Sequence, residues 1–296
     1  MPIPSRDDRR SLLAADCANC FGLCCVALSF ARSADFAFDK PAGEPCANLQ
    51  TDFACGIHER LRPSGFRGCT VFDCSGAGQK VSRDMCGGVS WRDDPAVRAE
   101  MFAVFPVMRD LHELLWYLAE ASDLPLDAAL HAEVAVAFAS TRDLTDLAPA
   151  DLLSRDIEPL RSRVGEMLGR VSEQVRCQLT PPWTPSAATR KVGPRADLMG
   201  ARFAGRDLRG ANLCGSLLIA ADLGGTDLTR TDLLGADLRD AMLDGARLDG
   251  ALFVTQRQLN SARGDSSTVL PAWAERPSHW KVGRAPHRPA TGTPIG

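Results

Sequence analysis

Hydrophobic positions between Ala196 and Thr255 recur every five residues. A helix places apolar residues three and four positions apart and a half-buried strand alternates them, so neither element explains this period. Every block of five has a leucine or phenylalanine at its centre, and these centres are Leu198, Phe203, Leu208, Leu213, Leu218, Leu223, Leu228, Leu233, Leu238, Leu243, Leu248 and Phe253. A short, fixed period is typical of a solenoid whose units bury their apolar faces by stacking on one another.

The other positions of the five-residue unit are also restricted. Two residues before each centre the side chain is small, with Arg206 as the exception, and the small residues are Ala196, Ala201, Ala211, Ser216, Ala221, Thr226, Thr231, Ala236, Ala241, Ala246 and Ala251. The residue just before the centre is most often acidic or an amide, as at Asp197, Asp207, Asn212, Asp222, Asp227, Asp232 and Asp237. Residues 196–255 therefore resemble the pentapeptide-repeat family.

That resemblance implies a fold. It is a right-handed quadrilateral β-helix with four pentapeptides per coil, in which the centre and the small residue point inward. The twelve centres then make three coils. Arg206 is expected to lie at a corner or to turn outward, because the interior is narrow.

Residues 93–180 have helical periodicity. A helix is predicted from Pro95 onward, after Asp93 and Asp94, and Pro106 is expected to kink or divide it. Its apolar positions are Val97, Met101, Val104, Phe105, Met108, Leu111, Leu115 and Leu118. Further helices are predicted at 126–140 and at about 156–179, which together form a small antiparallel bundle. The pairs His112–Glu113 and His131–Glu133 lack metal-ligand spacing and are expected on solvated helix faces.

The segments beside the repeats show neither the five-residue period nor helical periodicity over their full length. Residues 181–195 are rich in proline and predict a stiff linker. Residues 256–280 predict a cap with a short helix over Gln256 to Ala262, because the end of a solenoid must cover its exposed apolar face. Residues 281–296 are expected to be a disordered tail.

The cysteines mark the first 92 residues as a separate module. Of 11 cysteines, all but Cys177 and Cys214 lie between Cys17 and Cys86. Such density in a reducing cytosol favours metal ligands or redox chemistry over disulfides. Free buried thiols and disulfides are the remaining alternatives. The vicinal Cys24 and Cys25 point in different directions, so at most one is expected to join any given four-ligand site.

The pattern around these cysteines resembles the zinc- or iron-chelating proteins named for a CxxCxxCC motif. The matching residues are Cys17, Cys20, Cys24, Cys25, Cys46, Leu49, Cys55, Ile57, Arg62, Pro63 and Cys69. The sequence departs from the family pattern in the three residues between Cys20 and Cys24 and in His58, where an aromatic residue is usual. The resemblance implies a bound metal. The candidate ligands in this chain are Cys17, Cys20, Cys24, Cys25, Cys46, Cys55, Cys69 and Cys74, and the candidate cofactors are zinc and iron, including an iron–sulfur cluster.

Composition and charge narrow the function further. The chain has 296 residues, a hydrophobic content of 45% and a net charge of −3, which gives no electrostatic basis for binding nucleic acid or acidic lipid. No apolar run reaches the length of a membrane helix, and the first ten residues do not resemble a secretory signal, so a cytoplasmic protein is expected. The stretch from Asp73 to Lys80 lacks the ending of a phosphate loop and predicts only a flexible glycine-rich turn.

These observations favour a non-enzymatic protein, a metal-binding scaffold whose solenoid binds another protein. The alternative is an iron–sulfur or zinc-thiolate redox enzyme or sensor, although no nucleotide fingerprint, hydrolase elbow or pair of catalytic carboxylates is recognisable. Some pentapeptide-repeat proteins mimic DNA and bind gyrase, which requires a long acidic rod. Here the nine aspartates of the repeats exceed the seven arginines by only two, and three coils are short.

Overall fold

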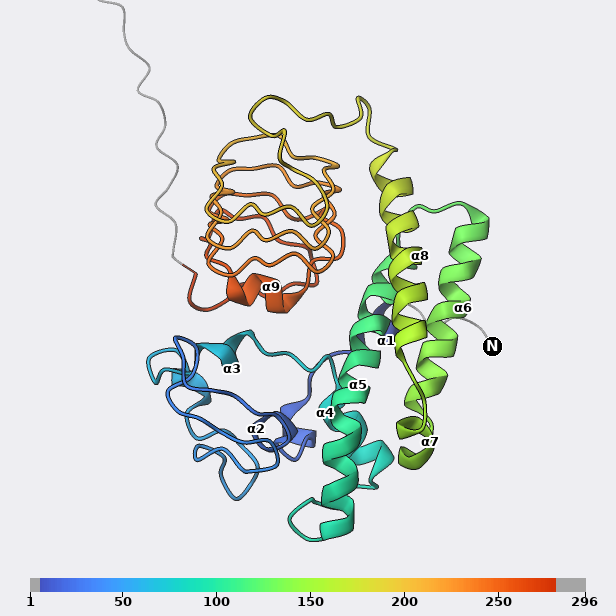
Figure 1. Ribbon diagram of the computed structural model, residues 1–296, viewed down its shortest axis with the longest axis vertical. Coiled ribbons are helices and arrows are strands. Elements are labelled where there is room, and N and C mark those ends of the chain that lie inside the picture. The colour runs from blue at the N-terminus through green and yellow to red at the C-terminus, as the bar shows by residue number, and fades with distance from the viewer. Residues whose placement is uncertain (1–5, 281–296) are drawn as a thin grey trace, which may run out of the picture. The chain divides into compact units, whose positions relative to one another are not determined.

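The computed structural model describes residues 6–280 and divides the chain into two compact units, with the boundary between Thr180 and Pro181 (Figure 1). The helical elements of the first unit are α1 (Arg6–Ser11), η1 (Cys17–Asn19), α2 (Leu23–Val26), η2 (His58–Arg60), α3 (Arg67–Val71), α4 (Ala77–Gln79), η3 (Lys80–Met85), α5 (Pro95–Ala121), α6 (Ala128–Thr145), α7 (Pro149–Leu153) and α8 (Glu158–Arg176). The second unit has one helix in its described part, α9 (Gln256–Ser261).

Helix α5 is the longest element of the first unit. The Asp94 carboxylate caps it by accepting hydrogen bonds from the backbone amides of Ala96 and Val97, at 2.7 and 3.3 Å. Pro106 lies inside this helix of 27 residues and does not divide it, contrary to one of the two expectations from the sequence. Its neighbours Phe105 and Met108 are fully buried, so tertiary packing compensates for the hydrogen bond that a proline removes.

The other long helices of the first unit, α6 and α8, run along α5 (Figure 1). Both helices begin and end within a few residues of the predicted positions. A short helix that was not predicted, α7, lies between them in the sequence. The cysteine-rich residues contain an aromatic cluster of Phe30, Phe36, Phe38 and Phe66, and they also share a core with the helices. Leu23, Val26, Ala77 and Trp91 belong to one apolar cluster together with residues of α5.

The second unit contains the repeat β-helix that the five-residue period predicts. Isolated parallel bridges join residues twenty positions apart, as in Asp197 with Leu217 and Asp207 with Asp227, and they form four columns. Each coil therefore takes four pentapeptides. All twelve leucine and phenylalanine centres are buried, each at 4% exposure or less, and they fill the interior. Arg206 is exposed, so the one large side chain at a small-residue position turns outward.

The ends of the solenoid are covered by the flanking segments of the same unit. Thr255 and Gln258 form a reciprocal capping box at the start of α9. After α9, parallel bridging continues between Met242 and Arg263 and between Arg247 and Val269, so the segment expected as a cap also extends the coils. At the other end, Val192 in the expected linker is buried in the solenoid core. The expected tail, residues 281–296, lies outside the described residues.

Candidate functional site

The candidate site is built around the short helix α2. Gly22 precedes this helix with a φ of +64°, a left-handed conformation that glycine adopts without strain. Leu23 and Val26 are fully buried, so their side chains anchor α2 in the core. Between them, Cys24 and Cys25 are both partly exposed, and their sulfur atoms lie 3.8 Å apart. Helix α2 therefore presents two adjacent thiols at the edge of the core.

A first group of thiols gathers beside Gly78, a buried residue of α4. A Cβ atom at Gly78 would lie 2.7 Å from the Cys20 sulfur and 3.6 Å from the Cys74 sulfur, so the absence of a side chain makes room for both. Cys17 lies within electrostatic reach of Cys74 and Cys25, and Cys24 lies within reach of Cys25, Cys20 and Cys17. The tertiary structure thus brings the opening cysteines and Cys74 together across more than fifty residues of sequence.

Backbone amides point at the sulfurs of this first group. The amides of Gly22 and Leu23 donate to the Cys20 sulfur, and those of Gly76 and Gly78 donate to the Cys74 sulfur. Hydrogen bonds of this kind stabilise a thiolate and are a usual feature around metal-bound cysteines. Gly76 and Gly78 are both buried, and Gly78 faces the two sulfurs, so the turn expected there as flexible is part of the packed site.

A second group of thiols, Cys46, Cys55 and Cys69, adjoins Cys25. The Cys46 amide donates to the Cys25 carbonyl oxygen at 2.8 Å, and Leu49 and Cys55 form an antiparallel bridge. Cys69 lies within electrostatic reach of Cys25, Cys46 and Cys55. The Ile57 amide donates to the Cys55 sulfur, which repeats the amide-to-sulfur arrangement of the first group.

Burial is the main cause of the raised pKa of most of these thiols. It raises the pKa of Cys20 to about 11 and that of Cys69 to about 12, because a thiolate loses solvation there. The vicinal pair is different. The hydrogen bond between its sulfurs raises the pKa of Cys24 and lowers that of Cys25. At neutral pH most of the thiols in the two groups therefore carry protons that a bound metal would displace.

A buried lysine adjoins the second group. Lys40 is only 4% exposed, and its ammonium donates to the carbonyl oxygens of Val26, Pro41 and Glu44 at 3.2, 2.9 and 2.9 Å. Its charge lies within electrostatic reach of the Cys46 and Cys25 sulfurs. The sequence analysis missed this residue, because a lysine is usually exposed and its burial here depends on tertiary contacts.

The sulfurs are not arranged as a closed metal site. Within residues 6–280, no three or more His, Cys, Asp or Glu side chains form a group that could hold an ion. All 11 cysteines are free thiols. His58 is exposed in η2. His112 was expected on a solvated face but is 4% exposed, because that face of α5 packs on the loop after Cys74, where its Nδ1–H donates to the Ser75 carbonyl oxygen at 2.6 Å.

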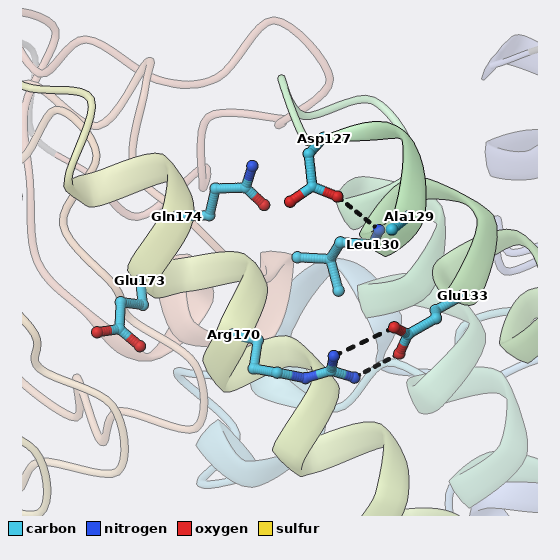
Figure 2. Close-up of a pocket in the computed structure, with 7 residues that line it drawn as sticks. All are labelled: Asp127, Ala129, Leu130, Glu133, Arg170, Glu173 and Gln174. Atoms are coloured by element: carbon cyan, nitrogen blue, oxygen red, sulfur yellow. Dashed lines mark hydrogen bonds and ion pairs between the residues drawn. The ribbon is translucent and has the colours of Figure 1, made fainter.

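An open depression of about 470 Å³ lies between α6 and α8, and Figure 2 shows its lining. Arg170 crosses it and forms a two-point ion pair with Glu133, at 2.5 and 3.3 Å. The remaining lining residues are Asp127, Ala129, Leu130, Glu173 and Gln174. Because its arginine is held by a carboxylate and its other charged groups are acidic, the depression has no arrangement suited to an anionic ligand.

The acidic residues of the solenoid are engaged in its own turns. Each aspartate or asparagine that precedes a centre accepts a hydrogen bond from the backbone amide two residues later, and these residues are Asp197, Asp207, Asn212, Asp222, Asp227, Asp232 and Asp237. Asp207 and Asp237 also form ion pairs with Arg209 and Arg239, each at 2.6 Å. The preference for Asp or Asn at this position is thus explained by turn geometry rather than by a binding surface.

No helix in the described residues is both long and apolar enough to cross a membrane. Two solved structures show local similarity to the chain. A pentapeptide repeat protein from the Arabidopsis thaliana thylakoid lumen is 25% identical, over 33% of this chain and 69% of that one, with a TM-score of 0.17. HetL, a pentapeptide repeat protein involved in heterocyst differentiation regulation in Nostoc sp. strain PCC 7120, is 31% identical over 24% of this chain and 43% of its own, with a TM-score of 0.10.

Sequence comparison covers more of the chain than the two solved structures do. The profile for pentapeptide repeats, with eight copies, matches residues 196–233 and 218–253. The uncharacterized protein YybG of Bacillus subtilis (strain 168) is 54% identical over 269 residues, which cover 91% of this chain and 95% of YybG. The similarity to YybG therefore includes the cysteine-rich residues as well as the repeats. This chain is a pentapeptide-repeat protein and belongs to the same family as YybG.

Proposed function

We propose that this protein is a non-enzymatic scaffold in which the cysteine-rich part of the first unit binds a metal and the solenoid binds another protein. The observation that carries the metal part is the gathering of Cys20 and Cys74 around the bare backbone of Gly78, with amides donating to both sulfurs. The residues that would hold metal are Cys17, Cys20, Cys24, Cys25, Cys46, Cys55, Cys69 and Cys74.

The donor set is suited to zinc or to iron, including an iron–sulfur cluster, because thiolates are soft ligands that both prefer. When bound, such a group would supply a cross-link between loops that are distant in the sequence. The chain's own residues prepare for it by directing backbone amides at the sulfurs of Cys20, Cys74 and Cys55. This role is structural, and it requires no substrate.

The interaction role of the solenoid is supported by how its interior is filled. Leucine and phenylalanine centres occupy it at 0–4% exposure, so the solenoid can offer only its outer faces to a ligand. Flat, extended faces built from stacked repeats are suited to a macromolecular partner. Acidic side chains that cap turns or pair with arginine do not form the dense negative field that mimicry of DNA requires, so we propose a protein partner.

Elemental analysis together with acid-labile sulfide and a visible spectrum tests this proposal, on untagged full-length protein purified without oxygen. We expect near-stoichiometric zinc without sulfide. Iron with sulfide and a brown colour would instead support the alternative, a redox enzyme or sensor. Folded protein that contains no metal and binds no added Zn²⁺, with all of its cysteines titrating as free thiols, would reject metal binding altogether.

A further inference from the structure

We propose that one outer face of the solenoid binds a protein segment in which apolar side chains are flanked by carboxylates. This inference rests on the interaction role proposed above and specifies its surface and the chemistry of its partner. The apolar face consists of Met199, Leu217 and Ile219, and Arg195 and Arg202 flank it.

The register of the coils places the three apolar side chains next to one another. The Gly200 amide donates to the Ile219 carbonyl oxygen at 2.9 Å, so Met199 lies one coil away from Ile219. Strands of neighbouring coils are about 4.8 Å apart. Leu217 and Ile219 stand on either side of the buried centre Leu218 and are therefore directed outward. The result is a continuous apolar surface across two coils.

The side chains of the apolar face are exposed, unlike other apolar residues at outward positions of the repeats. Met199 is 55% exposed and Leu217 39%, and Ile219 is partly exposed. Leu252 and Val254 also occupy outward positions, but they are 2% and 1% exposed because the chain covers them. Single exposed apolar residues are ordinary on a protein surface, whereas a contiguous group of them indicates a binding surface.

Arg195 and Arg202 give the apolar face a positive border. Arg195 lies at the corner that precedes the face, and Arg202 lies just beyond the next corner, where Gly200 turns with a positive φ. Both arginines are exposed, and within residues 6–280 neither forms an ion pair. Asp197, the acidic residue between them, accepts a hydrogen bond from the Met199 amide at 3.2 Å. A cation is therefore available on each side of the apolar side chains.

Charge is distributed unevenly along the solenoid, and the apolar face begins in its positive part. Residues 190–209 contain six lysines and arginines and two aspartates, which give a net charge of +4. Residues 210–254 contain three arginines and seven aspartates, which give a net charge of −4. The small surplus of aspartates over the repeats thus conceals a basic first coil, which attracts carboxylates.

The combination of apolar and cationic groups favours a protein segment over a nucleic acid. Most contacts between a protein and a nucleic acid go to the phosphates and sugars, which would leave Met199, Leu217 and Ile219 unused. A segment with apolar side chains between aspartates or glutamates matches both the centre and the border of the apolar face.

Selection of a displayed library of random peptides on the full-length protein tests this inference. We expect the enriched peptides to carry apolar residues flanked by aspartate or glutamate, and to bind less tightly as the salt concentration rises. Leu217→Ser should weaken their binding about tenfold, because one apolar side chain no longer buries its surface. The double substitution Arg195→Glu and Arg202→Glu should also weaken binding and reduce its salt dependence.

Val136→Ser and Arg163→Glu are the matched controls, because both residues are exposed on helices of the first unit. Neither change should affect the peptides, and circular dichroism checks that every variant is folded. Enriched peptides whose binding is unchanged by Leu217→Ser and by the arginine substitutions would overturn the assignment to the apolar face, while leaving an interaction role for the rest of the solenoid. Enrichment of basic peptides would overturn the chemistry of the partner.

A short single-stranded oligonucleotide provides the contrasting probe. If it bound the natural chain, and if the arginine substitutions but not Leu217→Ser weakened that binding, the partner would be a nucleic acid and the inference would be wrong. If no peptide were enriched, the interaction role proposed for the solenoid would itself be rejected.

Discussion

At the scale of single residues, His112 is held neutral by its surroundings. Burial lowers the pKa of its imidazole, because a charged ring would lose solvation there. The carbonyl of Ser75 can only accept a hydrogen bond, so the proton of the neutral ring resides on Nδ1. This contact ties α5 to the loop that carries Cys74.

The depressed pKa predicts a pH dependence with a definite sign. The unfolded chain binds a proton at His112 near pH 6.5 while the folded chain does not, so stability is fully present above that pH and falls as the pH drops toward the lower folded value. We expect the free-energy difference between the natural chain and His112→Asn to shrink between pH 7.5 and pH 5. Urea unfolding of both full-length proteins measures it. A difference that stays constant with pH would contradict this account.

Buried hydroxyl groups link successive coils of the solenoid. At the small-residue position, Ser216, Thr226 and Thr231 each donate to a backbone carbonyl 23 residues earlier, at 2.7 to 3.0 Å. Thr268 makes the same bond across 25 residues, beyond the last repeat. A hydroxyl therefore replaces alanine here without leaving an unsatisfied polar group inside the solenoid.

At the scale of the repeat, the turn after each centre favours glycine because of its backbone conformation. The residue two after the centre has a positive φ in ten consecutive units, from Gly200 to Gly245, and in seven of them it is glycine. Ala220, Arg230 and Asp240 adopt the same conformation despite their side chains. Left-handed backbone costs a residue other than glycine roughly 1–2 kcal/mol, which explains the frequency of glycine at this position.

Two glycine-to-alanine substitutions separate this effect from packing. A Cβ atom at Gly225 or at Gly169 would have no heavy atom within 4 Å, so neither change creates a clash. Gly225 has a φ of +61°, and Gly225→Ala should destabilise the solenoid by about 1 kcal/mol. Gly169 is exposed on α8, and Gly169→Ala should stabilise its helix by about 1 kcal/mol. Denaturant unfolding measures the change in the free energy of unfolding for each variant. If both changes had the same sign, backbone conformation would not explain the preference for glycine.

At the scale of the whole molecule, the two units depend on different forces. The solenoid is held by a filled apolar interior and by regular hydrogen bonds between coils, whereas the cysteine-rich loops have only short helices and isolated bridges and depend on the core that they share with α5. A metal would therefore matter to one unit and not to the other.

Removal of metal from the full-length protein tests this difference. We expect a strong chelator to accelerate amide hydrogen exchange across residues 17–86 while exchange across residues 196–254 stays slow, because the latter amides are bonded between coils. Mass spectrometry of peptic fragments resolves the two regions. Unchanged exchange throughout, in protein shown to have lost its metal, would assign the metal no structural role. Faster exchange in both regions would show that the solenoid depends on the first unit.

The repeat solenoid is determined by the sequence alone, since every pentapeptide carries its own centre and all but the one with Arg206 carry the small residue, so the same local rules recur along the segment. The helices of residues 93–180 were predicted for a similar reason, although the continuity of α5 through Pro106 required the surrounding core. The cysteines were recognisable as candidate ligands, but their division into two groups was not, because Cys74 joins Cys20 and Cys46 joins Cys25 only when distant loops pack together. The burial of Lys40 and His112 was equally invisible, since burial depends on what the rest of the chain places over a residue. Local periodicity determines elements, whereas the surroundings of a thiol, an ammonium or an imidazole are decided by tertiary contacts.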